Sequence, residues 1–73
     1  MRTEIITIGD ELLNGSRTDT NASYLALHLS ELGAEILRMT SVGDAQPVIE
    51  EAVREALSCA ELVVITGGLG PTA

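Results

Sequence analysis

A glycine-rich run lies near the end of the chain, directly after the apolar stretch 62–65. It reads Thr66-Gly67-Gly68-Leu69-Gly70-Pro71-Thr72. Glycines let several backbone N–H groups approach one anion, and threonine hydroxyls add donors. The spacing matches neither the P-loop nor the G-x-G-x-x-G motif, so a plain glycine-rich turn is the alternative. The candidate ligand-binding residues of this run are Thr66, Gly67, Gly68, Gly70 and Thr72.

Carboxylates follow the other two apolar stretches of the chain. Asp10 and Glu11 come shortly after the stretch 4–8, and Asp44 follows the stretch that ends at Val42. Carboxylates at neighbouring strand ends can hold a divalent metal ion or activate water. Asp10 and Asp44 are therefore the candidate catalytic and metal-binding residues. Solvated loop acids, and a helix cap at Asp44, are the open alternatives.

Composition excludes several classes of function. The 73 residues carry a formal charge of -7, with four Arg and no Lys, which disfavours nucleic acid and anionic membranes as partners. A single Cys and a single His exclude a disulfide framework and a zinc-type ligand cluster. No stretch approaches the roughly 20 apolar residues of a membrane span, and the start is no signal peptide. We expect a cytoplasmic location.

The apolar pattern predicts the elements that position these residues. Strands are expected at 4–8, 34–42 and 62–65, the first buried on both faces, and a loop at 9–19. A first helix starts at Thr20 or Asn21 and ends before Gly33, and a second starts near Asp44 or Gln46. The predicted core stripes of the two helices are Ala22, Leu25, Leu29 and Leu32, and Ile49, Ala52, Val53, Ala56 and Leu57.

This order of elements predicts an α/β fold with a parallel sheet, because apolar strands alternate with helices. Ligands of open parallel sheets bind beyond the carboxyl ends of the strands. The segments that leave those ends are 9–11, 42–44 and 67–70. We therefore expect all the candidate residues to gather at one edge.

Four motifs together resemble a known family. Gly9-Asp10-Glu11-Leu12-Leu13-x-Gly15, Asp19-Thr20-Asn21, Val42-Gly43-Asp44 and the glycine-rich run are similar to the molybdopterin-binding-like domain that opens the competence/damage-inducible protein A (CinA) family. The resemblance covers essentially the whole chain, 1–73. It implies a three-layer α/β/α fold, as in molybdenum-cofactor biosynthesis proteins, whose strand-end loops bind a small phosphorylated ligand.

The resemblance also implies an activity and roles for the residues. The CinA type is expected to hydrolyse a pyrophosphate such as ADP-ribose with a divalent metal ion, and longer members carry a lobe that deamidates nicotinamide mononucleotide. Asp44 matches an acidic ligand-site residue, and the glycines and Thr72 match the phosphate-side loop. The first-loop matches, expected to contribute to ligand binding, are Gly9, Asp10, Glu11 and Asn21.

Only Ala73 follows the glycine-rich run, where the family continues with two acidic residues and further strands and helices. The chain is thus predicted to be the first βαβαβ half of an N-terminal domain, and a fragment without activity of its own is one alternative. A non-catalytic module that binds molybdopterin is another. In addition, we expect copies of the chain to associate through an exposed edge strand.

Overall fold

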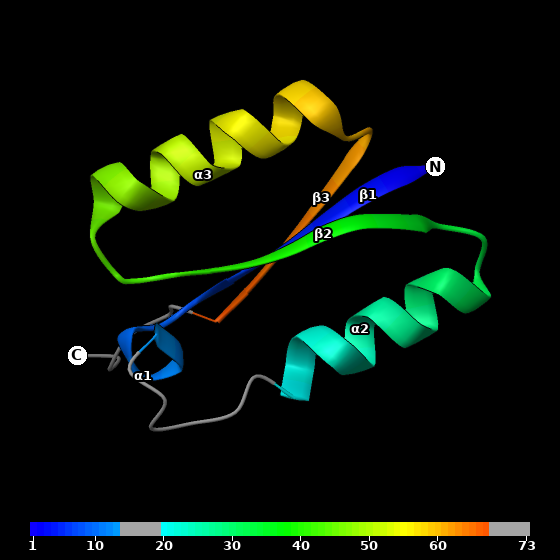
Figure 1. Ribbon diagram of the computed structural model, residues 1–73, viewed down its shortest axis with the longest axis horizontal. Helices are drawn as coiled ribbons and strands as arrows, with labels where there is room; N and C mark the ends of the chain where they lie inside the picture. The colour runs from blue at the N-terminus through cyan, green and yellow to red at the C-terminus, as the bar shows by residue number, and fades with distance from the viewer. Residues whose placement is uncertain (14–19, 68–73) are drawn as a thin grey trace.

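The computed structural model describes residues 1–13 and 20–67. Its sheet has three parallel strands, β1 (Arg2–Ile8), β2 (Glu35–Val42) and β3 (Leu62–Gly67), in the order β2-β1-β3. Two helices, α2 (Thr20–Glu31) and α3 (Gln46–Cys59), lie on opposite faces of the sheet (Figure 1). The predicted α/β class and parallel sheet are confirmed.

The central strand β1 is buried on both faces, as predicted. Every residue from Thr3 to Ile8 is buried, and Ile5 and Ile6 are 0% and 1% exposed. Ile6 and Ile8 form the core with Val42 and Ala56, against which half-buried Ile49, Ala52, Val53 and Val63 pack. Most of the predicted apolar stripe of α3 therefore faces the sheet.

Some predicted core residues are exposed instead. Leu57 is 62% exposed on α3, and Leu32 lies just beyond the last residue of α2. Leu37 and Met39 of β2 and Ile65 of β3 are also exposed. Both strands are edges of the three-stranded sheet, so each has a neighbouring strand on one side only.

The helix boundaries combine confirmed and corrected predictions. Gly33 adopts φ +98° just beyond α2, where a glycine was predicted to follow the helix. Its N–H donates to Ser30 O and Ala34 N–H donates to Leu29 O, each at 3.0 Å, which is the Schellman arrangement. The N-cap of α3 is Ala45, which makes no side-chain cap hydrogen bond, so Asp44 is not the cap.

The segment after β1 is not wholly a loop, contrary to the prediction. Asp10–Leu13 forms a short helix, α1, in which Leu12 N–H donates to Gly9 O at 3.1 Å. Two acidic residues, Asp10 and Glu11, occupy its first turn, where the partial positive charge of a helix N-terminus favours them.

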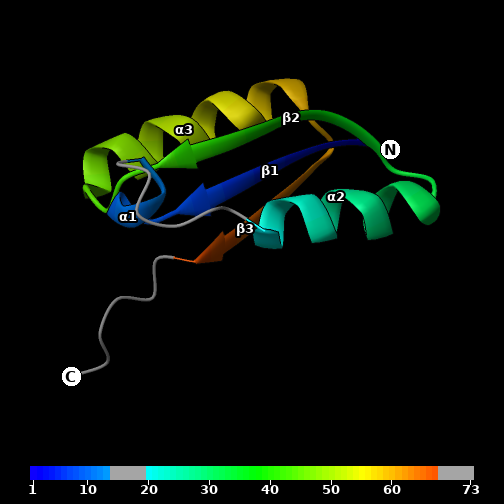
Figure 2. The ribbon, with the colours of Figure 1, turned by 60° about the horizontal axis from the view of Figure 1, so that its bottom comes forward.

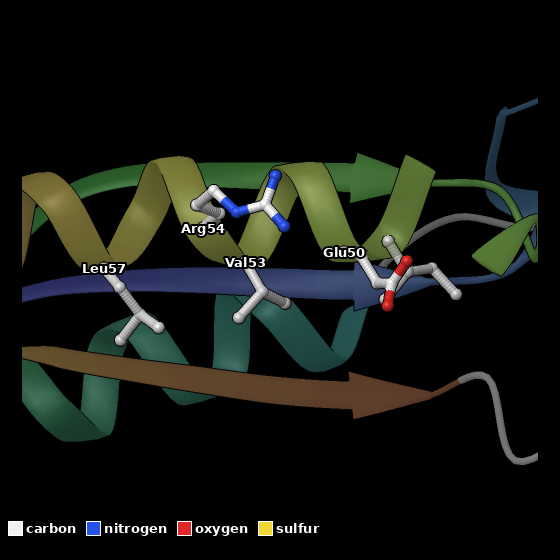
Figure 3. Close-up of a pocket in the computed structure, with 5 residues that line it drawn as sticks. Glu50, Val53, Arg54 and Leu57 are labelled. Atoms are coloured by element: carbon white, nitrogen blue, oxygen red, sulfur yellow. The ribbon is translucent and has the colours of Figure 1, made fainter. Parts of the chain in front are cut away.

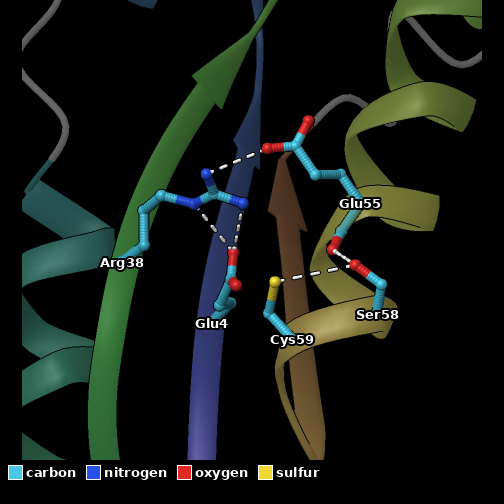
Figure 4. A network of polar contacts seen from close by, with 5 residues as sticks. All are labelled: Glu4, Arg38, Glu55, Ser58 and Cys59. Carbon is cyan, nitrogen blue, oxygen red and sulfur yellow. Dashed lines mark hydrogen bonds and ion pairs between the residues drawn. The ribbon is translucent and has the colours of Figure 1, made fainter.

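A buried carboxylate on β1 is paired across the sheet (Figure 4). The Glu4 side chain is 3% exposed, and its Oε1 accepts from Arg38 Nε at 3.0 Å and Nη2 at 2.9 Å. Arg38 Nη1 also contacts Glu55 Oε1 on α3 at 3.1 Å. Hydrogen bonds to Glu4, and then to Glu55, raise the pKa of Arg38 above its ordinary value. This network joins β1, β2 and α3.

Glu61 should respond to acid in a predictable direction. Its Oε1 accepts from the backbone N–H of Arg2 at 2.9 Å, which lowers the pKa of this carboxyl below its ordinary 4.5. A carboxyl whose pKa falls on folding stabilises the fold above its unfolded pKa, and that contribution is lost as pH falls through the folded pKa. We expect an NMR titration of Glu61 to have a midpoint below 4.5. An Arg2→Pro variant, which lacks the donor N–H, should bring the midpoint back toward 4.5.

Candidate functional site

The three strands end level with one another. Ile8 of β1 pairs with Val42 of β2 and with Gly67 of β3. All three strands therefore finish at the same edge of the sheet, formed by their carboxyl ends and called the strand-end edge below (Figure 2). The structure brings together the first loop, the Asp44 segment and the start of the glycine-rich run. Gly68, Gly70 and Thr72 lie outside the described residues.

The first loop is tied to β2 at its start. Gly9 is buried, and its N–H donates to Val42 O at 2.9 Å. A Cβ on Gly9 would lie 2.7 Å from Glu11 Oε1, so the Glu11 carboxylate folds back over the glycine. Asp10 and Glu11 themselves are exposed. Their carboxylates are therefore accessible at the edge where the strands end.

Asp44 lies next to Asp10, although the two are far apart in the sequence. Its backbone N–H donates to Asp10 Oδ1 at 3.0 Å. Gly43 before it is buried, whereas Asp44 is exposed. The predicted juxtaposition of the two carboxylate residues is thus present, and it is made through one side chain and one backbone amide. No pattern in the sequence indicates this hydrogen bond.

Gly67 occupies a backbone position that requires glycine. Its φ is +81°, and a Cβ there would lie 2.6 Å from Ile8 O of the neighbouring strand. Thr66 is half-buried beside Thr7 in the sheet register. Gly67, the second residue of the glycine-rich run, therefore has no room for a side chain against β1.

Asn21 belongs to the first turn of α2 and is exposed. Of the two ends of α2, the first turn is the nearer to the carboxyl ends of the strands (Figures 1 and 2). Among the described residues, no hydrogen bond or ion pair joins Asn21 to the other candidate site residues.

Few side chains of the described residues could bind a metal ion at this edge. Across residues 1–13 and 20–67, no three His, Cys, Asp or Glu side chains are grouped so that they could hold a metal ion. Asp10 and Asp44 supply two carboxylates. Mg²⁺ commonly binds through one or two carboxylates together with substrate phosphates, so the pair fits a cation shared with a phosphorylated ligand.

An apolar groove of about 380 Å³ lies elsewhere, on the surface of α3 (Figure 3). Its lining contains none of the candidate site residues and consists of Ile49, Glu50, Val53, Arg54 and Leu57.

In the part of the chain that the structure describes, no helix is long and apolar enough to cross a membrane.

Comparison with known proteins identifies the family. The family described as "Probable molybdopterin binding domain" matches residues 4–73. The chain belongs to this family. The resemblance predicted from the four motifs is confirmed, and the matching residues include every candidate of the strand-end edge.

Individual relatives of the family agree with this assignment. A CinA-like protein of Chlorobium phaeobacteroides is 51% identical over 72 residues, and Protein PH0439 of Pyrococcus horikoshii is 54% identical over 70. These alignments cover 99% and 94% of the chain but only 17% and 28% of the relatives. A crystal structure of CinA from Thermoplasma acidophilum, of unknown function, has a TM-score of 0.92 and 39% identity, covering 97% of this chain and 42% of that one.

Proposed function

We propose that the strand-end edge binds a small phosphorylated ligand, a nucleotide or a pterin, and that the complete protein hydrolyses a nucleotide pyrophosphate such as ADP-ribose. The observation that supports this most directly is the level ending of the three strands at Ile8, Val42 and Gly67. Asp10, Asp44 and Gly67, near the start of the glycine-rich run, therefore lie at the same edge, where parallel sheets bind ligands.

Each group has a role that suits its chemistry. Backbone amides of the glycine-rich run would donate to phosphate oxygens. This role falls to backbone groups because the acidic chain has only four basic residues. The carboxylates of Asp10 and Asp44 are the candidates to hold a divalent cation, which would offset charge on the pyrophosphate. Hydrolysis adds water across the P–O–P bond, so ADP-ribose gives AMP and ribose 5-phosphate.

A second candidate function is binding without hydrolysis. The family description names molybdopterin binding, and the same loops would hold a phosphorylated pterin. Fold and anion binding do not determine the reaction. The chain spans 17% of the length of the CinA-like relative, so the separated 73 residues are proposed to be inactive on their own. A cytoplasmic location and association of copies stay predictions.

Incubation of the full-length protein with ADP-ribose and Mg²⁺ or Mn²⁺ tests the hydrolase proposal. We expect metal-dependent formation of AMP, measured by chromatography, and a fall of about 100-fold or more in kcat/KM for Asp44→Asn. Glu51→Gln, an exposed carboxylate on α3, is the matched control and should be unaffected. Absence of AMP, together with calorimetric binding of a phosphorylated pterin, would favour the binding module instead.

A further inference from the structure

We propose that Asp10 is a positioning residue, which fixes Asp44 at the edge and acts on the bound ligand through it. The nature of that ligand rests on the proposed function. The positioning itself rests on the contact between Asp10 Oδ1 and the backbone N–H of Asp44, 3.0 Å apart. This assignment replaces the cation contact suggested above for Asp10: its Oδ1 would serve as an acceptor within the protein, and Asp44 would hold the cation.

The contact continues the pairing of β1 and β2 past the end of the sheet. Ile8 pairs with Val42, and Gly9 N–H still reaches Val42 O at 2.9 Å. The backbone then turns into α1 at Asp10 and leaves the ladder. The side-chain oxygen of Asp10 takes the place of the missing backbone acceptor. The residues that follow β2, including Asp44, therefore remain attached to the segment that follows β1.

The Asp44 segment has little else to hold it among the described residues. Asp44 is exposed, and the following Ala45 caps α3 without any side-chain hydrogen bond. A hydrogen bond to an ionised carboxylate is shorter and stronger than one to a neutral acceptor. An aspartate at position 10 is thus well suited to keep the Asp44 carboxylate at the edge.

The position of the acceptor oxygen matters more for this role than the charge, which only strengthens the hydrogen bond. Asp10→Asn keeps an oxygen at the same position, whereas Asp10→Ala removes it. Asp10→Glu keeps the charge but moves the oxygen by one methylene. A cation ligand would show the opposite order, because the amide of Asn loses the charge that a divalent cation prefers.

Two measurements on the full-length protein test the inference. Hydrogen exchange by NMR reports the Asp44 amide without any ligand, and calorimetry with inorganic pyrophosphate and Mg²⁺ reports the site. We expect Asp10→Ala to speed exchange of this amide and weaken pyrophosphate binding by about tenfold each. Asp10→Asn should keep both within about threefold, and the control Glu51→Ala should change neither.

The outcomes separate the inference from the proposed function. Unchanged exchange of the Asp44 amide in Asp10→Ala would overturn the positioning role, as would an Asp10→Asn variant that binds pyrophosphate as weakly as Asp10→Ala. If Asp10→Ala unfolds, Asp10→Glu replaces it, and fast exchange with retained charge supports positioning. If wild type binds no pyrophosphate, the proposed function fails on that arm, and amide exchange alone decides whether Asp10 holds Asp44.

Discussion

Replacing Gly67 with alanine is expected to lower the free energy of unfolding by about 3 kcal/mol. The residue has φ +81°, which an L side chain adopts only with strain. The new Cβ would also lie 2.6 Å from Ile8 O, a backbone atom of the central strand. Moving either backbone to relieve this contact would loosen the pairing of β1 with β3. Urea denaturation followed by circular dichroism measures the loss.

Gly33→Ala is the matched control for this variant. Gly33 also has a positive φ, +98°, but a Cβ there would meet no atom within 4 Å. It should therefore cost only the backbone strain, about 1 kcal/mol. Equal losses for the two variants would show that close packing against Ile8 contributes nothing at Gly67. Position 67 would then not require glycine for lack of space.

Replacing Arg38 with methionine is expected to lower Tm by about 10 °C or more. The Glu4 carboxylate would stay buried on the central strand without the two hydrogen bonds that Arg38 donates at 2.9 and 3.0 Å. A buried charge without its partner is strongly destabilising. Arg54→Met is the control, because Arg54 is exposed and forms no ion pair with another described residue. Differential scanning calorimetry gives both values.

A double variant tests the cause of that loss. Glu4→Leu combined with Arg38→Met replaces the ion pair with apolar side chains of similar size, which is often neutral or stabilising. We expect the double variant to recover most of the Tm lost by Arg38→Met alone. A double variant less stable than the single one would mean that the lost packing of Arg38, and not the unpaired Glu4, accounts for the effect.

The order of residue types along the chain was enough to predict several features of the site. Level strand ends follow from short apolar strands that pair in parallel, so the meeting of the Asp10, Asp44 and Gly67 segments was predictable. The hydrogen bond from Asp44 to Asp10 was not. It joins residues 34 positions apart. Its formation depends on the pairing register and on where β1 turns into α1.

The sequence by itself determined the order of the three strands and of α2 and α3 along the chain, the burial of β1 on both faces and the end of α2 before Gly33. These properties depend on local periodicity and on backbone preferences of single residues. Only the tertiary structure decided that Leu57 is exposed, that Ala45 caps α3 and that Arg38 pairs with Glu4. Such properties depend on which surfaces meet across the sheet, because packing and hydrogen bonding join residues that no local pattern relates.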